Sequence, residues 1–107
     1  MKLHRLIVPV LLAATAAGCT WTKLTPYGEQ ARILNANQVG SCKPLGTTTA
    51  QVAAKVIGIP RPQRDVERDL QNLARNALQS VNGDTIVPVG RPQDGSQTFR
   101  MYRCINP

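Results

Sequence analysis

The sequence predicts a small α+β domain in which one helix packs on one sheet that is mostly antiparallel. Residues 65–81 place apolar side chains at spacings of three and four, which is the period of a helix. Residues 47–52 are rich in β-branched side chains, and residues 97–104 alternate apolar with polar ones, as strands do. Because strand-like stretches precede and follow the helix, the expected order is β-β-α-β-β, in a single sheet.

The helix is expected to bury one face and to stop at Asn82-Gly83. The apolar face consists of Val66, Leu70, Leu73, Ala77, Leu78 and Val81. Three carboxylates are expected in the first turn, where they complement the positive end of the helix dipole: Asp65, Glu67 and Asp69. Gly83 is expected to take the left-handed conformation that ends the helix.

The four strands are expected over residues 31–34, 47–52, 84–89 and 97–104. Pro88 has no N–H for a ladder hydrogen bond, so its strand is expected to lie at an edge or to end there. The Asp94-Gly95 pair predicts a turn within residues 90–96. Residues 56–62 contain a glycine and two prolines, and we expect them to form a loop.

The N-terminus has the pattern of a bacterial lipoprotein signal. Lys2 and Arg5 precede an apolar run that fades into small residues and ends at Gly18-Cys19. The run is shorter than the roughly 20 residues of a spanning helix. A small residue directly before a cysteine is typical of lipoprotein cleavage, so Cys19 is expected to be lipidated. Cleavage by an ordinary signal peptidase within residues 13–17 is the alternative.

This interpretation divides the chain into a signal peptide over residues 1–18, a lipidated N-terminus and tether over residues 19–30, and a domain over residues 31–107. Of the three cysteines, lipidation of Cys19 leaves Cys42 and Cys104. Exported compartments favour disulfides, so we expect these two to form one. A zinc site is the alternative, but zinc takes three or four Cys or His ligands, and the only histidine leaves with the signal. No metal or cofactor is expected.

The mature domain is expected to be basic. Lys2 and Arg5 leave with the signal, so 11 of the 13 basic side chains remain against 6 acidic ones, a formal charge of +5. Such a charge attracts anionic lipid or peptidoglycan, although a solvated basic surface is the favoured explanation. Five arginines are candidates for a patch: Arg61, Arg64, Arg91, Arg100 and Arg103. Nucleic acid is not expected, because the chain is exported and carries few aromatic side chains for stacking.

Enzymatic activity is not expected, and no catalytic residue is assigned. A Ser-His-Asp or Cys-His arrangement needs a histidine, which the mature chain lacks. Two carboxylate pairs are the acid–base candidates that the sequence offers, Asp84 with Asp94 and Asp65 with Asp69. The first pair lies in turn-like sequence and the second at the start of the helix, so structural roles are expected for all four.

Several motifs in order resemble one family of small bacterial lipoproteins. They are Val39-x-x-Cys42-Lys43-x-Leu45-Gly46-Thr47, Leu73-Ala74-Arg75-Asn76, Gly83-Asp84-Thr85-Ile86-Val87-Pro88, Thr98-Phe99 and Tyr102-Arg103-Cys104. Over roughly residues 21–104 the chain is similar to lipoproteins grouped as domain of unknown function family 4156. More remotely, its layout is similar to the outer-membrane lipoprotein that senses surface stress for the Rcs phosphorelay, which has two disulfides.

The resemblance implies an interaction or stress-sensing role in the cell envelope. Thr20 follows Cys19, where an Asp would be typical of retention in the inner membrane, so the sorting rule implies the outer membrane. The expected protein is therefore an outer-membrane lipoprotein that faces the periplasm and contacts an envelope protein. The alternative is a structural lipoprotein that binds peptidoglycan or anionic lipid through its basic surface.

Overall fold

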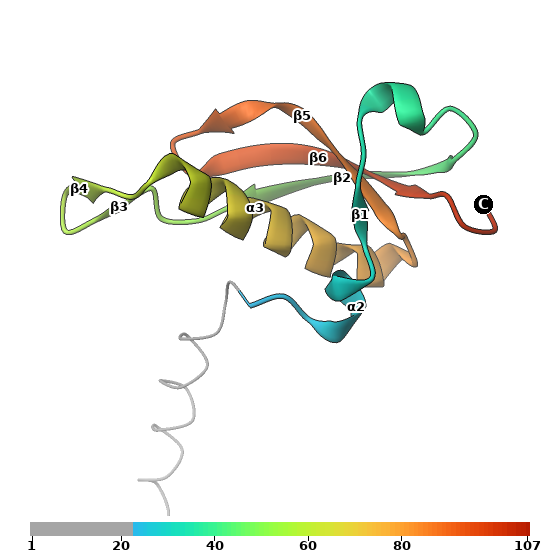
Figure 1. The fold of residues 1–107 in the computed structure, drawn as a ribbon, viewed down its shortest axis with the longest axis horizontal. Helices are drawn as coiled ribbons and strands as arrows, with labels where there is room; N and C mark the ends of the chain where they lie inside the picture. Colours follow the sequence, from blue (N-terminus) through green and yellow to red (C-terminus); the bar gives the residue numbers. More distant parts are fainter. Residues whose placement is uncertain (1–22) are drawn as a thin grey trace, which may run out of the picture.

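The structure is a computed structural model that describes residues 23–107, so the predicted signal peptide and Cys19 lie outside the described residues. Within residues 23–107 the elements follow in the order α2 (Pro26–Glu29), β1 (Arg32–Ile33), η2 (Ala36–Gln38), β2 (Lys43–Gln51), β3 (Lys55–Val56), β4 (Ile59–Pro60), α3 (Gln63–Ala77), η3 (Leu78–Val81), β5 (Thr85–Gln93) and β6 (Ser96–Arg103) (Figure 1). In these residues no helix is long and apolar enough to cross a membrane.

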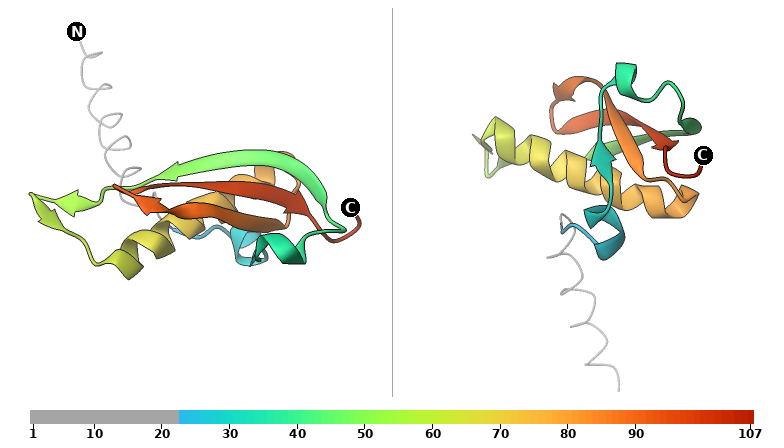
Figure 2. Two further views of the ribbon diagram at one scale, coloured as in Figure 1. Left: turned by 90° about the horizontal axis from the view of Figure 1, so that it is seen from above. Right: turned by 45° about the vertical axis from the view of Figure 1, so that its right-hand side comes forward.

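The main sheet contains four strands in the order β1-β5-β6-β2. β1 runs parallel to β5, while β6 pairs antiparallel with both β5 and β2. Figure 2 shows the sheet as one layer, with α3 lying across one of its faces. The predicted α+β class and the order β-β-α-β-β are therefore confirmed, with a second small sheet, the hairpin β3–β4, inserted between β2 and α3.

α3 and the η3 turn that continues it bury the face that the periodicity predicts. Val66, Leu70 and Leu78 are buried against the sheet, whereas Leu73 and Val81 are partly buried around them. Ala74 is buried and Ala77 is only partly so, which corrects one position of the predicted face. The helix begins at Gln63, two residues earlier than predicted, so only Asp65 of the three carboxylates lies in the first turn.

The end of the helix differs from the prediction in one residue. After α3 the chain tightens into η3, and the left-handed residue that follows is Asn82, with φ of 56°, rather than Gly83. Asparagine tolerates this conformation better than other residues with a Cβ. Gly83 instead lies in a tight space, because a Cβ built there would lie 2.7 Å from Cδ2 of Leu78 and 3.1 Å from the carbonyl oxygen of Tyr102.

The β5–β6 hairpin confirms the predicted turn and extends the strand before it. Asp94 and Gly95 form a two-residue loop with φ of 50° and 75°, as a type I′ turn requires. β5 was expected to end at residue 89 but reaches Gln93 through a bulge. The side-chain amide of Gln97 donates to the carbonyl of Gly90 within this bulge, 3.0 Å away.

Pro88 limits the pairing of β5 with β1. The N–H of Arg32 donates to the carbonyl of Asp84, and that of Leu34 donates to Ile86. In a parallel ladder the next donor would be residue 88, and proline has none. The prediction that this strand lies at an edge or ends at Pro88 is therefore wrong, because β5 lies between β1 and β6 and continues to Gln93, although its pairing with β1 stops before Pro88.

The prediction of a loop over residues 56–62 is wrong. Lys55 pairs with Pro60, and Val56 pairs with Ile59, in a short antiparallel hairpin. Ile57 and Gly58 form its turn, with φ of 53° and 77°. Pro60 is tolerated because a two-stranded ladder leaves each strand one unpaired side.

The prediction of a tether is wrong for residues 25–30. The side chain of Thr25 caps α2 by accepting from the N–H of Gly28, which is buried. The N–H of Thr25 donates to Oδ1 of Asn76 on α3, 2.9 Å away, and the hydroxyl of Tyr27 donates to the carbonyl of Gly83. This segment is therefore fixed to the end of α3, and the folded domain begins near Thr25.

Candidate functional site

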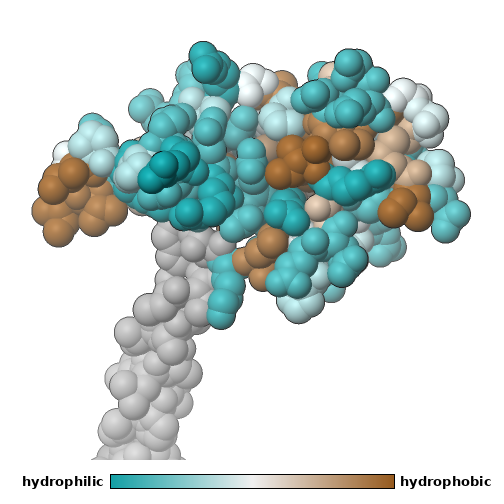
Figure 3. Space-filling model, in the orientation of Figure 1, coloured by the Kyte–Doolittle hydropathy of each residue, from teal (hydrophilic) through white to brown (hydrophobic). Residues whose placement is uncertain are grey.

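Three exposed apolar side chains gather at the end of the β3–β4 hairpin. Val56 is 54%, Ile57 95% and Ile59 68% exposed. We call these three residues the hairpin tip. In Figure 3 they form the apolar end of the molecule that projects beyond the start of α3. Single exposed apolar residues are ordinary, but a cluster at a projecting point is typical of a contact surface.

The turn of this hairpin adds backbone strain to the unfavourable exposure of its apolar side chains. Ile57 is β-branched and has a φ of 53°, in the left-handed region where such side chains are rarely found. A polar residue or glycine would avoid both this backbone strain and the exposure of an apolar side chain. Strained positions are concentrated at functional sites, so the hairpin tip is our candidate functional site.

The base of the hairpin is held firmly to the domain. The N–H of Arg61 donates to the carbonyl of Ala54, and its Nη1 donates to Ala53 at 3.1 Å. Nη2 of the same side chain bonds Oδ2 of Asp69, a buried carboxylate on α3, at 2.7 Å. Arg61 therefore joins the chain before β3, the chain after β4 and the helix.

The turn between β5 and β6 closes the other side of this base. The N–H of Val52 donates to the carbonyl of Gly95, 2.8 Å away. A Cβ at Gly95 would clash with the carbonyl oxygen of Val52, so only glycine permits this approach. A pocket of about 200 Å³ lies between the hairpin, the start of α3 and this turn. The tip thus projects from a fixed base rather than from a loose loop.

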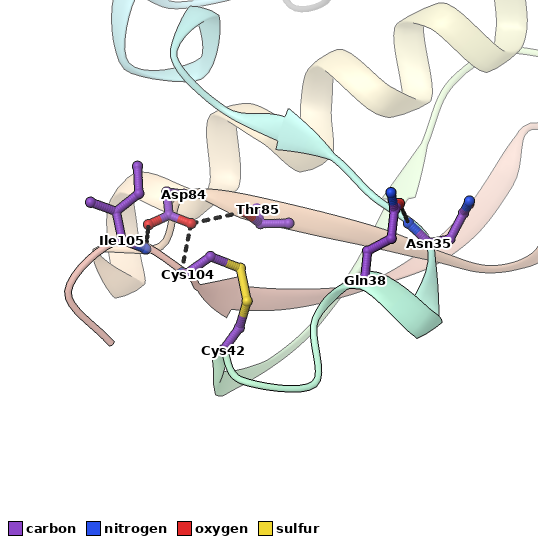
Figure 4. Close-up of a disulfide and its surroundings, with 7 residues drawn as sticks. All are labelled: Asn35, Gln38, Cys42, Asp84, Thr85, Cys104 and Ile105. Carbon is purple, nitrogen blue, oxygen red and sulfur yellow. Dashed lines mark hydrogen bonds between the residues drawn. A yellow bond between two sulfur atoms is a disulfide. The ribbon is translucent and has the colours of Figure 1, made fainter.

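The opposite end of the sheet is closed by the disulfide. Cys42 and Cys104 are joined as predicted, linking the residue before β2 to the residue after β6 (Figure 4). Beside them the carboxylate of Asp84 accepts from the N–H groups of Cys104 at 2.8 Å and Ile105 at 2.9 Å, and from the hydroxyl of Thr85. One carboxylate therefore holds the chain just beyond β6 against the start of β5.

These contacts decide the charge state of Asp84. Burial acts to raise the pKa of this carboxyl, but the two N–H donors, the Thr85 hydroxyl and the nearby Arg32 outweigh it and lower the pKa below its ordinary value. The folded state consequently binds fewer protons here than the unfolded chain. Its contribution to stability is present above the ordinary aspartate pKa and is lost as the pH falls below it.

Asp84→Ala is expected to lower the free energy of unfolding at pH 7 by about 2 kcal/mol, because two backbone N–H groups lose a charged acceptor. The difference from wild type should shrink below about pH 4, where the carboxylate of the unfolded chain becomes protonated more readily than that of the folded chain. Urea unfolding at pH 7 and at a pH below about 4 measures this difference in the free energy of unfolding. Asp84→Asn keeps one acceptor oxygen and should lose less. A difference that does not change with pH would contradict the role of the charge.

Structural contacts account for the predicted carboxylate pairs, and Asp65 and Asp69 share Arg68, whose nitrogens lie 3.4 Å and 3.6 Å from them. Asp84 and Asp94 lie at opposite ends of β5, and Asp94 occupies the left-handed turn. Asp69 binds Arg61, while Asp65 lies 3.4 Å from Nη1 of Arg68 in an exposed pair.

The five arginines do not form one patch, because Arg61 and Arg103 lie at opposite ends of the domain and Arg100 lies in the middle of β6. Arg61 holds the hairpin base, whereas Arg103 donates to the carbonyl of Asn82 near the disulfide.

Sequence reasoning missed the hairpin tip. Its signal was a set of apolar residues placed among prolines and a glycine, where a solvated loop would be polar.

Taken together, the fold and the site define a small α+β domain that is closed by a disulfide at one end and projects an apolar hairpin at the other. Residues 22–104 match the family described as Domain of unknown function (DUF4156), and the chain belongs to this family. No curated protein and no solved structure matches the chain.

Proposed function

We propose that this protein is a lipid-anchored interaction module of the bacterial envelope, which binds its partner through the hairpin tip and catalyses no reaction. The observation that carries the proposal is the exposure of Val56, Ile57 and Ile59 on a hairpin whose base is fixed. A rigid apolar projection is costly in water, and burial against a partner would recover that cost.

The compartment is supported by the chemistry of the cysteines. A disulfide between Cys42 and Cys104 suits an oxidising compartment such as the periplasm. Cys19, preceded by a signal-like stretch, supplies the site for a lipid anchor. Thr20 after it favours the outer membrane by the sorting rule, so the domain is proposed to face the periplasm.

A non-catalytic role is supported by what the carboxylates already do. Asp69 forms a salt bridge with Arg61 that fixes the hairpin, and Asp84 accepts hydrogen bonds that hold the chain just beyond β6. The alternative of a structural lipoprotein with one basic binding surface is less well supported, because Arg61 and Arg103 make structural contacts at opposite ends of the sheet.

Photo-crosslinking in cells tests the interaction. A photoreactive residue at position 59 is expected to form a specific adduct with an envelope component, protein or lipid, because this side chain lies in the hairpin tip. The matched control is position 79, an exposed residue of η3 outside the tip. The adducts are identified by mass spectrometry. No adduct from position 59, or equal labelling from both positions, would refute the proposal.

The intact mass of the membrane-extracted protein tests the anchor separately. We expect the mass of residues 19–107 plus a lipid group, with two thiols that alkylate only after reduction. A mass without lipid would remove the anchor from the proposal, while leaving the crosslinking result to decide the function of the hairpin.

A further inference from the structure

We propose that the hairpin tip inserts into the interface of an anionic lipid bilayer, so that the domain contacts the membrane at a second point besides its anchor. The inference deepens the proposed function by naming the partner, and its geometric part rests on the anchor at Cys19. It is carried by three features of the hairpin: its shape, its charge and its distance from the start of the folded domain.

The shape of the tip suits a lipid surface. Ile57, almost fully exposed, and Gly58 lie at the end of a hairpin with only two paired residues per strand. A Cβ built at Gly58 would meet no atom within 4 Å, so the turn projects into open space. A bilayer accepts such a projecting apolar point without a groove shaped to receive it, and interfacial segments bury their apolar side chains at this depth.

The hairpin and its flanking residues carry charge of one sign along the sequence, although Asp94 of the β5–β6 turn lines the pocket at the hairpin base together with Lys55. Residues 51–64 contain Lys55, Arg61 and Arg64 and no acidic residue. Lys55 stands directly beside the tip, and Arg64 lies exposed in the first turn of α3. Cations flanking an apolar segment are drawn to the negative surface of a bilayer that contains anionic lipids. This complementarity favours anionic lipid over an apolar groove on another protein.

The geometry of the chain brings the tip within reach of the same membrane. Lys23 and Thr25 are both bonded to Asn76 near the end of α3, so the chain from Cys19 to Lys23 places the proposed anchor no more than about 14 Å from this point. The hairpin leaves the other end of α3, at Gln63, about 20 Å away along the helix axis. A domain held this close can lie with α3 along the surface, and then both its start and its hairpin reach the lipid.

Insertion is tested with the full-length, membrane-extracted protein reconstituted in vesicles. Ile59→Trp is made together with Trp21→Phe, which removes the only native tryptophan and leaves the indole at position 59 as the sole reporter. In vesicles that contain anionic lipid with brominated acyl chains, we expect strong quenching and a blue shift of its fluorescence. Lys55→Gln and Arg64→Gln are expected to shift the insertion equilibrium by about fivefold each.

Ile105→Trp in the same background is the matched control. Ile105 is 61% exposed, similar to Ile59, but lies beside the disulfide at the other end of the sheet. Its indole is expected to remain unquenched. Absence of quenching at position 59, equal quenching at both positions, or equal quenching at position 59 in vesicles of zwitterionic lipid alone would overturn the inference.

The tests separate the inference from the proposed function. A protein adduct from position 59 in cells, together with no quenching in vesicles, would refute membrane insertion and leave the interaction module standing. A mass without lipid would refute the anchor, whereas quenching at position 59 would still show that the tip enters the bilayer.

Discussion

Reduction of the Cys42–Cys104 disulfide is expected to lower the free energy of unfolding by about 4 kcal/mol. The bridge joins residues 62 positions apart, so opening it releases a long loop in the unfolded chain. That loss is comparable to the whole stability of many small domains. The reduced protein is therefore expected to be largely unfolded at growth temperature, because α3 and the hairpin both lie inside the released loop.

Urea unfolding with and without reductant measures this effect. The double variant Cys42→Ala with Cys104→Ala is the matched control, since it removes the bridge without any reductant and should unfold at the same urea concentration as the reduced protein. Equal unfolding midpoints for the oxidised and reduced wild type would show that packing alone determines the stability of the domain.

Phe99→Ala is expected to lower the free energy of unfolding by about 3–5 kcal/mol. Phe99 is 0% exposed and lies in the core cluster with Leu70, Leu78 and Ile86, where the helix meets the middle of the sheet. Removing the ring leaves a cavity that two rigid layers cannot close. Because the disulfide remains in this variant, the loss is measured by urea unfolding under oxidising conditions.

Two further substitutions define the cause of that loss. Phe99→Leu keeps most of the volume and is expected to lose less than Phe99→Ala. Arg100→Ala changes the next residue of β6, which is exposed, and should change stability by no more than about 0.5 kcal/mol. If Arg100→Ala lowered the free energy of unfolding as much as Phe99→Ala, the loss would come from disruption of the strand rather than from the core.

The parts of the fold that depend on periodicity could be predicted from the sequence. Val66, Leu70 and Leu78 recur at helical spacing, and Phe99 and Met101 alternate along a strand, so their burial against one another follows from patterning. The Asp94-Gly95 turn was equally predictable, because both residues take positive φ with little strain. The Cys42–Cys104 pair followed from the count of cysteines.

The features that the sequence did not reveal depend on tertiary contacts. Residues 25–30 have no period of their own and are ordered by Asn76, far along the chain. The hairpin pairs only two residues on each strand, too few for a recognisable alternation, and its base is fixed by Arg61 and Asp69. Asp69 was therefore assigned to the helix dipole, although it is a buried partner of an arginine eight residues earlier.

The disulfide divides the described chain into a covalently closed ring, residues 42–104, and an N-terminal segment that lies outside the ring. The ring contains β2, the hairpin, α3, β5 and β6, whereas α2, β1 and η2 lie outside it and are held by hydrogen bonds and by packing, with Tyr27 and Ala31 against the core. A mechanical pull on the N-terminus would therefore peel off β1, with its two residue pairs, before the ring yields. The 17 peptide links from Thr25 to Cys42 would then span up to about 55 Å while the ring stays folded.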